Sequence, residues 1–449
     1  MALGGGIGGY QGGTNNKTLH MGLQDTFKLA WADPELQQRI IFILKMFALY
    51  VLGLHIQVPV PGIDASKLIN SLGDNAYFQL LNTLGGGGLK KVSILALGLG
   101  PYITSSIIMQ ILTTALPNLK KEMQEGGEHA RKQQNRRTRM LTLVLTVFQG
   151  MQILKMMGPS VIPANLMTYS SVIGFWMAGS MFLLWMGEQL SEKGIGNGTS
   201  LLIFAGIVIT FPSQIQIIAE KWLSVNKFGV LAIALMFVGM TWVVVYFTLA
   251  QRRIPIQHTR RQLGTKVIGG GASYLPFSVN MVGVIPIIFA SALIYMPAQF
   301  STMFPVNSSP RHFLESVSKY TSPNFTEWTG YVGALAYMAL IFFFTYFYTA
   351  IQYNVDDIAD NLKRNQSMIP GIRPGKQTRD FLDQVISRVT VVGAIFLSIV
   401  SLSQYLVPVL VNVAGLSAMF GTSLLIMVSV ALETMRQIQA NLIMKQYGQ

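Results

Sequence analysis

The 449-residue chain contains no cysteine and few charged residues, and both shortages restrict what it can be. Without cysteine it can form neither a disulfide framework nor a thiolate metal site. Charged residues make up only 12% of the chain, roughly half the soluble average of about 25%, whereas apolar residues make up 51%. A soluble fold would have too little polar surface, so the composition indicates an integral membrane protein.

Sequence patterns of enzyme active sites are also missing. The five histidines are scattered without the spacing of metal ligands, and no His-Glu-x-x-His, Ser-His-Asp or phosphate-loop pattern occurs. An intramembrane serine protease would need Gly-x-Ser-x-Gly, which is absent. We therefore expect a protein that is not an enzyme and that needs neither a cofactor nor a metal.

Apolar stretches of about 20 residues, the length that crosses a bilayer, recur ten times. Their predicted cores are 40–58, 92–112, 140–157, 169–186, 201–218, 230–249, 282–304, 331–353, 389–411 and 419–444. Pro101 and Pro286 lie within two of them, where neighbouring helices or water must satisfy the freed backbone groups. We predict an all-α integral membrane protein of ten transmembrane helices, in two pseudo-symmetric inverted halves of five that divide near Phe228.

The basic residues predict the orientation of these spans. Of the 33 Lys and Arg residues, 24 fall on the side that carries both termini and 8 on the opposite side. By the positive-inside rule, both termini are cytoplasmic. The net charge of +14 therefore reflects membrane orientation, and nucleic acid is not needed to explain it.

The N-terminus lacks the basic-then-apolar pattern of a cleavable signal peptide, since 4–13 is rich in glycine. We expect the first span to anchor the chain uncleaved. Residues 30–39 read as a short amphipathic helix at the inner surface, with Trp31 and Leu36 on its apolar side. A plain cap on the first span accounts for this segment equally well.

A glycine-rich turn leads directly into the fifth span, in the string Gly194-Ile-Gly-Asn-Gly-Thr-Ser200. Its glycines permit positive φ and close backbone approach, and Thr199 and Ser200 are predicted to cap the helix that follows. The string resembles the signature of the SecY family, the channel subunits of the protein-conducting Sec translocon. The likeness runs from about Trp31 to Tyr447 and includes Ala96-Leu-Gly-Leu-Gly-Pro-Tyr-Ile103, Gly283-Val-Ile-Pro-Ile-Ile-Phe-Ala-Ser291 and Gly421-Thr-Ser-Leu-Leu-Ile426.

The resemblance implies a channel that passes unfolded secretory proteins across the bacterial cytoplasmic membrane and releases membrane-protein segments through a lateral gate. Its two halves, 40–227 and 228–444, would form a clamshell around a central pore, between a cytoplasmic tail at 1–39 and a short tail at 445–449. The partners that it implies are SecE-like and SecG-like subunits, the SecA motor, the ribosome, signal sequences and membrane lipid.

A constriction without fixed charge would hold back ions yet yield to a passing chain. By resemblance, the pore ring comprises Leu99, Ile103, Thr199, Ile203, Ile288 and Ile426. Thr199 stands where the family pattern has isoleucine, which weakens that assignment. From spacing alone, each of these side chains is more often expected to face lipid or to pack in the protein core than to line a pore.

A short helix is predicted at about 63–72, after the first span, because its apolar residues share one helical face and Asp64 can cap it. Flexible glycines flank it at Gly73 and 85–88. A surface helix on the outer ends of the spans would have the same pattern. The resemblance favours the plug of the channel, with Ile63, Asp64, Leu68, Ile69 and Leu72.

Polar side chains within spans are costly unless they are paired or wetted. By resemblance, Thr104, Gln110 and Gln149 would belong to the lateral gate; ordinary interhelical hydrogen bonding is the alternative.

Two loops, 251–280 and 354–388, are longer than a connection requires. They resemble the loops that dock the ribosome and SecA, with Arg252, Arg253, Arg260 and Arg261 suited to ribosomal RNA phosphates and Arg373 to a specific partner. Solvated turns that only set the orientation are the alternative.

A secondary transporter is the main rival function, because inverted halves and broken helices are shared with channels. Transporters usually hold charged groups near the bilayer midplane, whereas Asp and Glu here lie mostly in loops or near span ends. We therefore favour a passive channel driven from outside.

Overall fold

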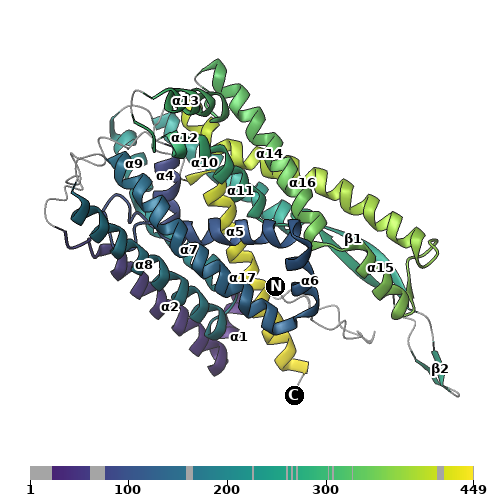
Figure 1. Cartoon of the computed structure of the whole chain (residues 1–449). Helices are drawn as coiled ribbons and strands as arrows, with labels where there is room; N and C mark the ends of the chain where they lie inside the picture. The colour runs from purple at the N-terminus through teal and green to yellow at the C-terminus, as the bar shows by residue number, and fades with distance from the viewer. Residues whose placement is uncertain are drawn as a thin grey trace.

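The computed structural model describes residues 23–60, 76–157, 165–224, 227–258, 261–263, 266–268, 272–301, 303–305, 308–325, 327–411 and 419–447. Most of these residues are helical, and Figure 1 shows the long helices side by side in one bundle. Seven of the described helices are long and apolar enough to cross a membrane. The chain is therefore mostly helical, as the composition predicts.

Among the described residues before 225, the elements are all helical: α1 (Leu23–Ala32), α2 (Pro34–His55), α4 (Ala76–Leu84), α5 (Gly100–Ala115), α6 (Pro117–Glu125), α7 (Gly127–Met157), α8 (Leu166–Lys193) and α9 (Gly198–Ser224). The later helices are α10 (Lys227–Leu249), α11 (Ile285–Ile294), α12 (Met296–Ser301), α13 (Ser309–Thr321), α14 (Trp328–Gln352), α15 (Val355–Arg364), α16 (Lys376–Val411) and α17 (Thr422–Tyr447). The strands are β1 (Gln251–His258), β2 (Arg261–Leu263), β3 (Lys266–Ile268), β4 (Ala272–Ser278) and β5 (Ser367–Met368).

The second predicted span is not one continuous helix. Its helical part, α5, begins at Gly100 with Pro101 in the first turn, and 85–99 forms turns whose residues are largely buried. Gly86 has a φ of +68°, and a Cβ there would lie 3.3 Å from the Cα of Gly206 on α9. The prediction that 85–88 is a loose flank is therefore wrong, because these glycines bring the backbone close to α9.

The seventh predicted span is broken as well. Its first part, α11, ends at Ile294, and α12 starts one residue after Tyr295. Pro297 has no backbone N–H to donate to the carbonyl four residues earlier, so the helix cannot continue regularly through it. The result is two short helices in place of one long one.

The two long polar loops form a sheet, so the all-α prediction is wrong for this part of the chain. Strand β1 pairs antiparallel with β4, from Gln251 opposite Ser278 to Gln257 opposite Ala272, and its other edge pairs with β5. Along β1, Ile254 and Ile256 are buried, which is the alternation of a half-buried strand. Figure 1 shows this sheet and α15 projecting together from one side of the bundle.

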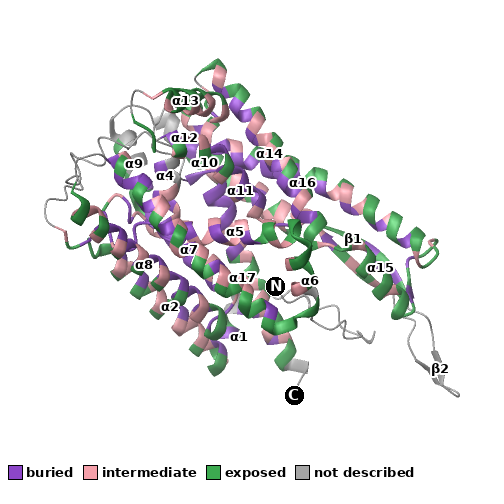
Figure 2. Ribbon diagram, viewed as in Figure 1, coloured by how far each residue is buried: buried purple, intermediate pink, exposed green. Residues whose placement is uncertain are grey.

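The two largest of the four apolar clusters among the described residues form the main cores of the bundle. The first core is centred on Tyr50, Leu183 and Leu202, from α2, α8 and α9; the second is centred on Ile287, Tyr337 and Leu397, from α11, α14 and α16. Figure 2 shows buried residues gathered around α5 and α11, with exposed ones on the outward sides of α2 and α14. Helix α17 belongs to both, because Ile426 packs in the first core and Leu425 in the second.

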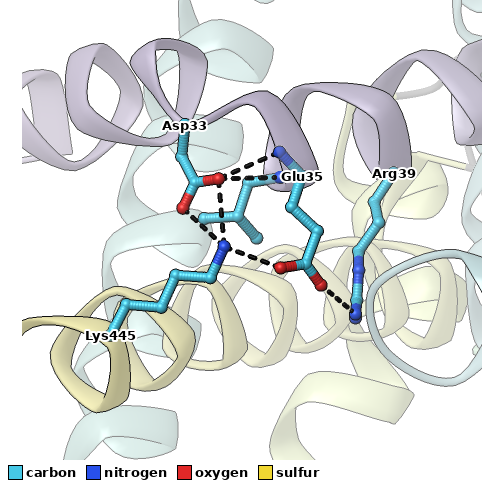
Figure 3. Close-up of polar contacts among 5 residues, drawn as sticks. Asp33, Glu35, Arg39 and Lys445 are labelled. Carbon is cyan, nitrogen blue, oxygen red and sulfur yellow. Dashed lines mark hydrogen bonds and ion pairs between the residues drawn. The ribbon is translucent and has the colours of Figure 1, made fainter. Parts of the chain in front are cut away.

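The N-terminal helices contact the end of α17. The side chain of Asp33 caps α2 by accepting from the N–H of Glu35 at 2.9 Å, and this cap separates α1 from α2. The amphipathic helix predicted over 30–39 is therefore divided at Asp33. Lys445 Nζ lies between the carboxylates of Asp33 and Glu35, at 2.8 and 2.7 Å (Figure 3).

Candidate constriction and gate

The glycine-rich turn before α9 fits its helix tightly against α8. Gly196 has a φ of +92°, a conformation that favours glycine. A Cβ at Gly198 would lie 2.0 Å from the carbonyl oxygen of Gly187, so only glycine fits there. The Oγ of Ser191 accepts a hydrogen bond from the N–H of Gly198 at 2.8 Å. The string therefore fixes the position at which α9 begins.

Asn197 is the residue that caps α9. Its Oδ1 accepts from the N–H groups of Thr199 and Ser200, at 3.1 and 3.3 Å. The prediction that Thr199 and Ser200 supply the cap is therefore wrong. The hydroxyl of Thr199 donates to the same Oδ1 at 2.6 Å, and its methyl carbon lies near Gly187 of α8.

Four of the six residues predicted for the pore ring belong to the first core. Leu99 and Ile426 are buried within it, and Ile103 and Ile203 are partly buried against it. They come from the turn before α5, from α5 itself, from α9 and from α17. Chain segments far apart in sequence thus bring these branched apolar side chains into one cluster.

The two cores meet beside this cluster. Val284, just before α11, and Met427 on α17 pack against both cores. Ile288, which is also predicted for the ring, follows four residues after Val284 and is half-buried, whereas its neighbours Ile287 and Phe289 are buried in the second core.

Gln110 on α5 is hydrogen-bonded to the second core. Its Oε1 accepts from the hydroxyl of Tyr348 on α14 at 2.7 Å, and Tyr348 is only 5% exposed. Two neighbours on α5, Ile107 and Ile111, pack against the same core. The C-terminal half of α5 therefore packs against the second core. Sequence reasoning missed Tyr348 because it is one of many aromatic residues in its span and no motif distinguishes it.

A second set of contacts, besides the one between α5 and α14, joins α7 to α12. The rings of Phe148 and Phe300 lie 5.6 Å apart, and Gln152 Nε2 donates to the carbonyl oxygen of Gln299 at 3.5 Å. The spacing of Gln152 from Gln149, three residues along one helical face, could have pointed to it. We call these two contacts, together with the Gln110–Tyr348 hydrogen bond, the seam.

The other two predicted gate residues bond to each other. Gln149 Nε2 donates to Thr104 Oγ1 at 3.4 Å, and Thr104 Oγ1 donates to the carbonyl oxygen of Gly100 at 3.1 Å. Both are partly buried between α5 and α7. Of the three predicted gate residues, only Gln110 bonds across the seam.

The residues predicted for the plug, Ile63, Asp64, Leu68, Ile69 and Leu72, lie outside the described residues.

Three of the five arginines predicted for docking lie on the projecting sheet and its neighbouring turn. Arg252 and Arg253 are exposed on β1, and Arg373 is exposed in the turn between β5 and α16. Positive φ values of +83° at Gly371 and +106° at Gly375 shape that turn, and Thr378 Oγ1 donates to the carbonyl oxygen of Arg373 at 2.9 Å. Arg260 lies outside the described residues, and Arg261 is placed only as backbone, in β2.

Comparison with known proteins identifies similar chains over nearly the full length. A profile of the SecY family matches residues 93–435. The protein translocase subunit SecY of Aquifex aeolicus is 38% identical over 437 residues, which is 95% of this chain and 99% of the relative.

Solved structures share the fold. One described as a protein conducting channel matches with a TM-score of 0.65 at 18% identity, over 90% of this chain and 91% of that chain. Sec61 in a canine ribosome-channel complex from the endoplasmic reticulum matches with a TM-score of 0.63 at 17% identity, again over 90% and 91%.

Proposed function

This chain belongs to the SecY family and is a protein-conducting translocation channel, not an enzyme. We propose that unfolded secretory proteins pass through a constriction between its two cores. We also propose that membrane-protein segments leave the channel through the seam. The seam carries the proposal. It consists of three side-chain contacts that join α5 to α14 and α7 to α12, at 2.7 and 3.5 Å for the hydrogen bonds and 5.6 Å for the aromatic rings. Contacts of this kind hold a closed state without making opening prohibitive.

The proposed constriction is formed by Leu99, Ile103, Ile203, Ile288 and Ile426. Four of them, all except Ile288, cluster in the first core beside the place where both cores meet, and this supports the assignment because a ring of branched apolar side chains excludes water from a narrow passage. We assign Thr199 to the turn that positions α9 instead, because its hydroxyl is already bonded to Asn197. The segment at 63–72 is proposed as the plug above this ring.

Ten transmembrane spans remain the proposed count. Seven helices qualify by length and apolarity. The proposed others are α5, the α11–α12 pair and α17, each of which is shorter, interrupted or less apolar. Division near Phe228 into inverted halves of five, 40–227 and 228–444, with both termini in the cytoplasm follows from this count and from the basic residues.

The projecting sheet is the proposed docking surface for the ribosome and the SecA motor, from loops 251–280 and 354–388. Exposed arginines on β1 suit RNA phosphates, and the likeness to a channel solved in a ribosome complex supports a ribosomal partner. SecE-like and SecG-like subunits, signal sequences and lipid are the other proposed partners, in the cytoplasmic membrane of a bacterium.

A cysteine pair tests whether the seam opens during transport. The chain has no native cysteine, so Phe148→Cys with Phe300→Cys introduces the only thiols. Oxidation should block both translocation and release of membrane segments in reconstituted vesicles, and a reductant should restore them. The matched control is Phe247→Cys with Phe396→Cys, whose rings stack 4.7 Å apart within the second core. Equal transport by the oxidised seam pair and the oxidised control would refute the gate.

A secondary transporter would behave differently after purification. Retention of a small SecE-like membrane protein in mild detergent is the outcome that the channel predicts. Specific uptake of a solute by the purified chain alone would instead support the rival.

A further inference from the structure

An open apolar groove lies beside the seam, on the outward side of α7. Its volume is about 440 Å³, and Val144, Val147 and Met151 of α7 line it together with Met303 just after α12. Val144 is 65% exposed and Met151 44% exposed. In a membrane this exposed apolar surface of α7 contacts lipid, so a lipid group is expected to fill the groove.

The groove is as long as one leaflet is deep. From Val144 to Lys155, eleven residues of α-helix rise about 16 Å. Half of a hydrocarbon core of about 30 Å is about 15 Å. An acyl chain that lies along the groove would therefore reach from the bilayer midplane to the headgroup level.

Lys155 supplies a charge at the headgroup end. It lines the groove, is exposed, and lies two residues before Met157, the last residue of α7. No ion pair joins it to a carboxylate among the residues that the structure describes. An ammonium group at this level complements a lipid phosphate.

We propose that this groove binds one acyl chain of an anionic phospholipid, with Lys155 Nζ on the headgroup phosphate. With the orientation proposed above, the lipid comes from the outer leaflet. A helical peptide fits less well, because a helix of the same length and about 10 Å across fills about 1,300 Å³, three times the groove.

The bound chain would touch the residues that close the seam. Phe148 and Gln152 line the groove and are the same residues that contact Phe300 and Gln299 of α12. A chain in the groove therefore covers the seam from the lipid side. Its departure is required before a membrane segment can leave by that route, which makes the site a lipid-dependent brake on release.

Photolabelling in nanodiscs tests the site. The full chain, with any partner subunit that co-purifies, is placed in phosphatidylglycerol that carries a diazirine at mid-chain, and labelled peptides are mapped. Labelling should concentrate within residues 144–155. Lys155→Gln should reduce it about fivefold, and Lys155→Arg should retain it. Lys91→Gln, which removes another exposed lysine that lies beside His55, should have no effect.

A second variant fills the groove without changing charge. Val147→Trp should abolish labelling at 144–155, whereas Leu335→Trp, on the exposed side of α14, should not. Uniform labelling of all lipid-facing helices, or labelling that survives both Lys155→Gln and Val147→Trp, would overturn the site. Equal labelling by phosphatidylcholine would overturn the role of Lys155.

The competing occupant is tested in the same nanodiscs. A synthetic signal peptide with the same photoreactive group should not label 144–155 in the resting channel. Labelling by the peptide there, with none by phosphatidylglycerol, would assign the groove to signal sequences. Because the readout is binding and not transport, either failure leaves the channel assignment standing.

Discussion

Lys445 Nζ lies 2.8 Å from Asp33 Oδ2 and joins the end of α17 to the start of α2, across 412 positions of sequence (Figure 3). Asp33 also caps α2, so one carboxylate holds both a helix start and a distant helix end. A second bond, from Gln439 Nε2 to Thr26 Oγ1 at 3.4 Å, ties α17 to α1. We call this group of contacts the clasp.

The clasp predicts a pH dependence of stability. The hydrogen bond from Lys445 lowers the pKa of Asp33 from 3.8, and the same bond raises the pKa of Lys445 from 10.5. A lowered acidic pKa adds stability that is complete above about pH 5 and is lost as the pH falls through the folded-state value. A raised basic pKa adds stability below 10.5 that is lost at higher pH. The contribution of the clasp should therefore be constant from about pH 5 to pH 9.

Asp33→Asn should lower the apparent Tm of the detergent-solubilised protein at pH 7, because Asn keeps a capping oxygen but loses the charge. The difference from wild type should shrink as the pH falls below 3.8 and through the lower folded-state pKa of Asp33, because the carboxylate then becomes protonated in both states. Lys132→Gln, which breaks an exposed pair with Glu128 within one helix, is the control. A pH-independent difference for Asp33→Asn would show that the charge is not responsible.

The hydrogen bond from Tyr348 to Gln110 predicts a looser gate when it is removed. Tyr348→Phe deletes only the hydroxyl, and a hydrogen bond of this kind, which is partly buried here, is worth about 1 kcal/mol, or about fivefold in the ratio of open to closed channels. Preproteins with defective signal sequences should then pass about fivefold faster in reconstituted vesicles.

Tyr346→Phe is the matched control on the same helix, since Tyr346 is exposed and its hydroxyl lies 3.5 Å from the carbonyl oxygen of Ser387 on α16. If Tyr348→Phe and Tyr346→Phe speed the passage of preproteins with defective signal sequences equally, the hydrogen bond from Tyr348 to Gln110 does not hold the gate closed.

Sequence periodicity predicted the long helices well because their apolar runs exceed the bilayer thickness. It failed where backbone geometry overrides apolarity. The apolar run that begins at Val92 predicts a span. In the structure, however, the glycines at 85–88 bring the backbone close to α9, and the helix of this span, α5, starts only at Gly100. Pro297 similarly interrupts an apolar run that hydropathy alone would make one helix, so that α11 and α12 are separate.

The candidate site was predictable only as far as its motifs reached. Leu99, Ile103 and Ile426 fall in quoted strings, and the structure brings them into one cluster. Tyr348 and Phe300 belong to no motif, because their role depends on which helices become neighbours. The strands were missed for a similar reason: the Ile254 and Ile256 alternation is short, and its partner strand comes from a different part of the loop.

Charge reversal at the loop tip should abolish transport without loss of folding. Arg373 is exposed in a turn held by Gly371, Gly375 and Thr378, so Arg373→Glu should leave the apparent Tm nearly unchanged. Preprotein translocation by reconstituted vesicles should fall to background. Lys376→Glu, exposed three residues further on, is the control. Normal translocation by the Arg373→Glu channel would remove this arginine from the docking surface.

Wetting the constriction should raise resting leak. Ile288→Asn places an amide beside the apolar cluster, and deletion of 63–72 removes the proposed plug. Each should increase single-channel ion conductance at rest and admit preproteins with defective signal sequences. Ile288→Leu, which keeps the side chain apolar, should leak like wild type. Unaltered leak in both the Asn variant and the deletion would contradict the ring and the plug.

Asn197 and Thr199 separate a capping role from a pore role at the start of α9. Asn197 Oδ1 accepts two backbone N–H groups, so Asn197→Ala should cost about 1 kcal/mol of stability. Thr199→Ile should lower the apparent Tm, because it loses the hydroxyl bond at 2.6 Å and crowds Gly187. Since we place Thr199 against α8 and not in the ring, neither Thr199→Ile nor Thr199→Asp should change resting ion leak. A leak that falls with Ile and rises with Asp would instead put this side chain in the throat of the channel, where a fixed charge admits water and ions.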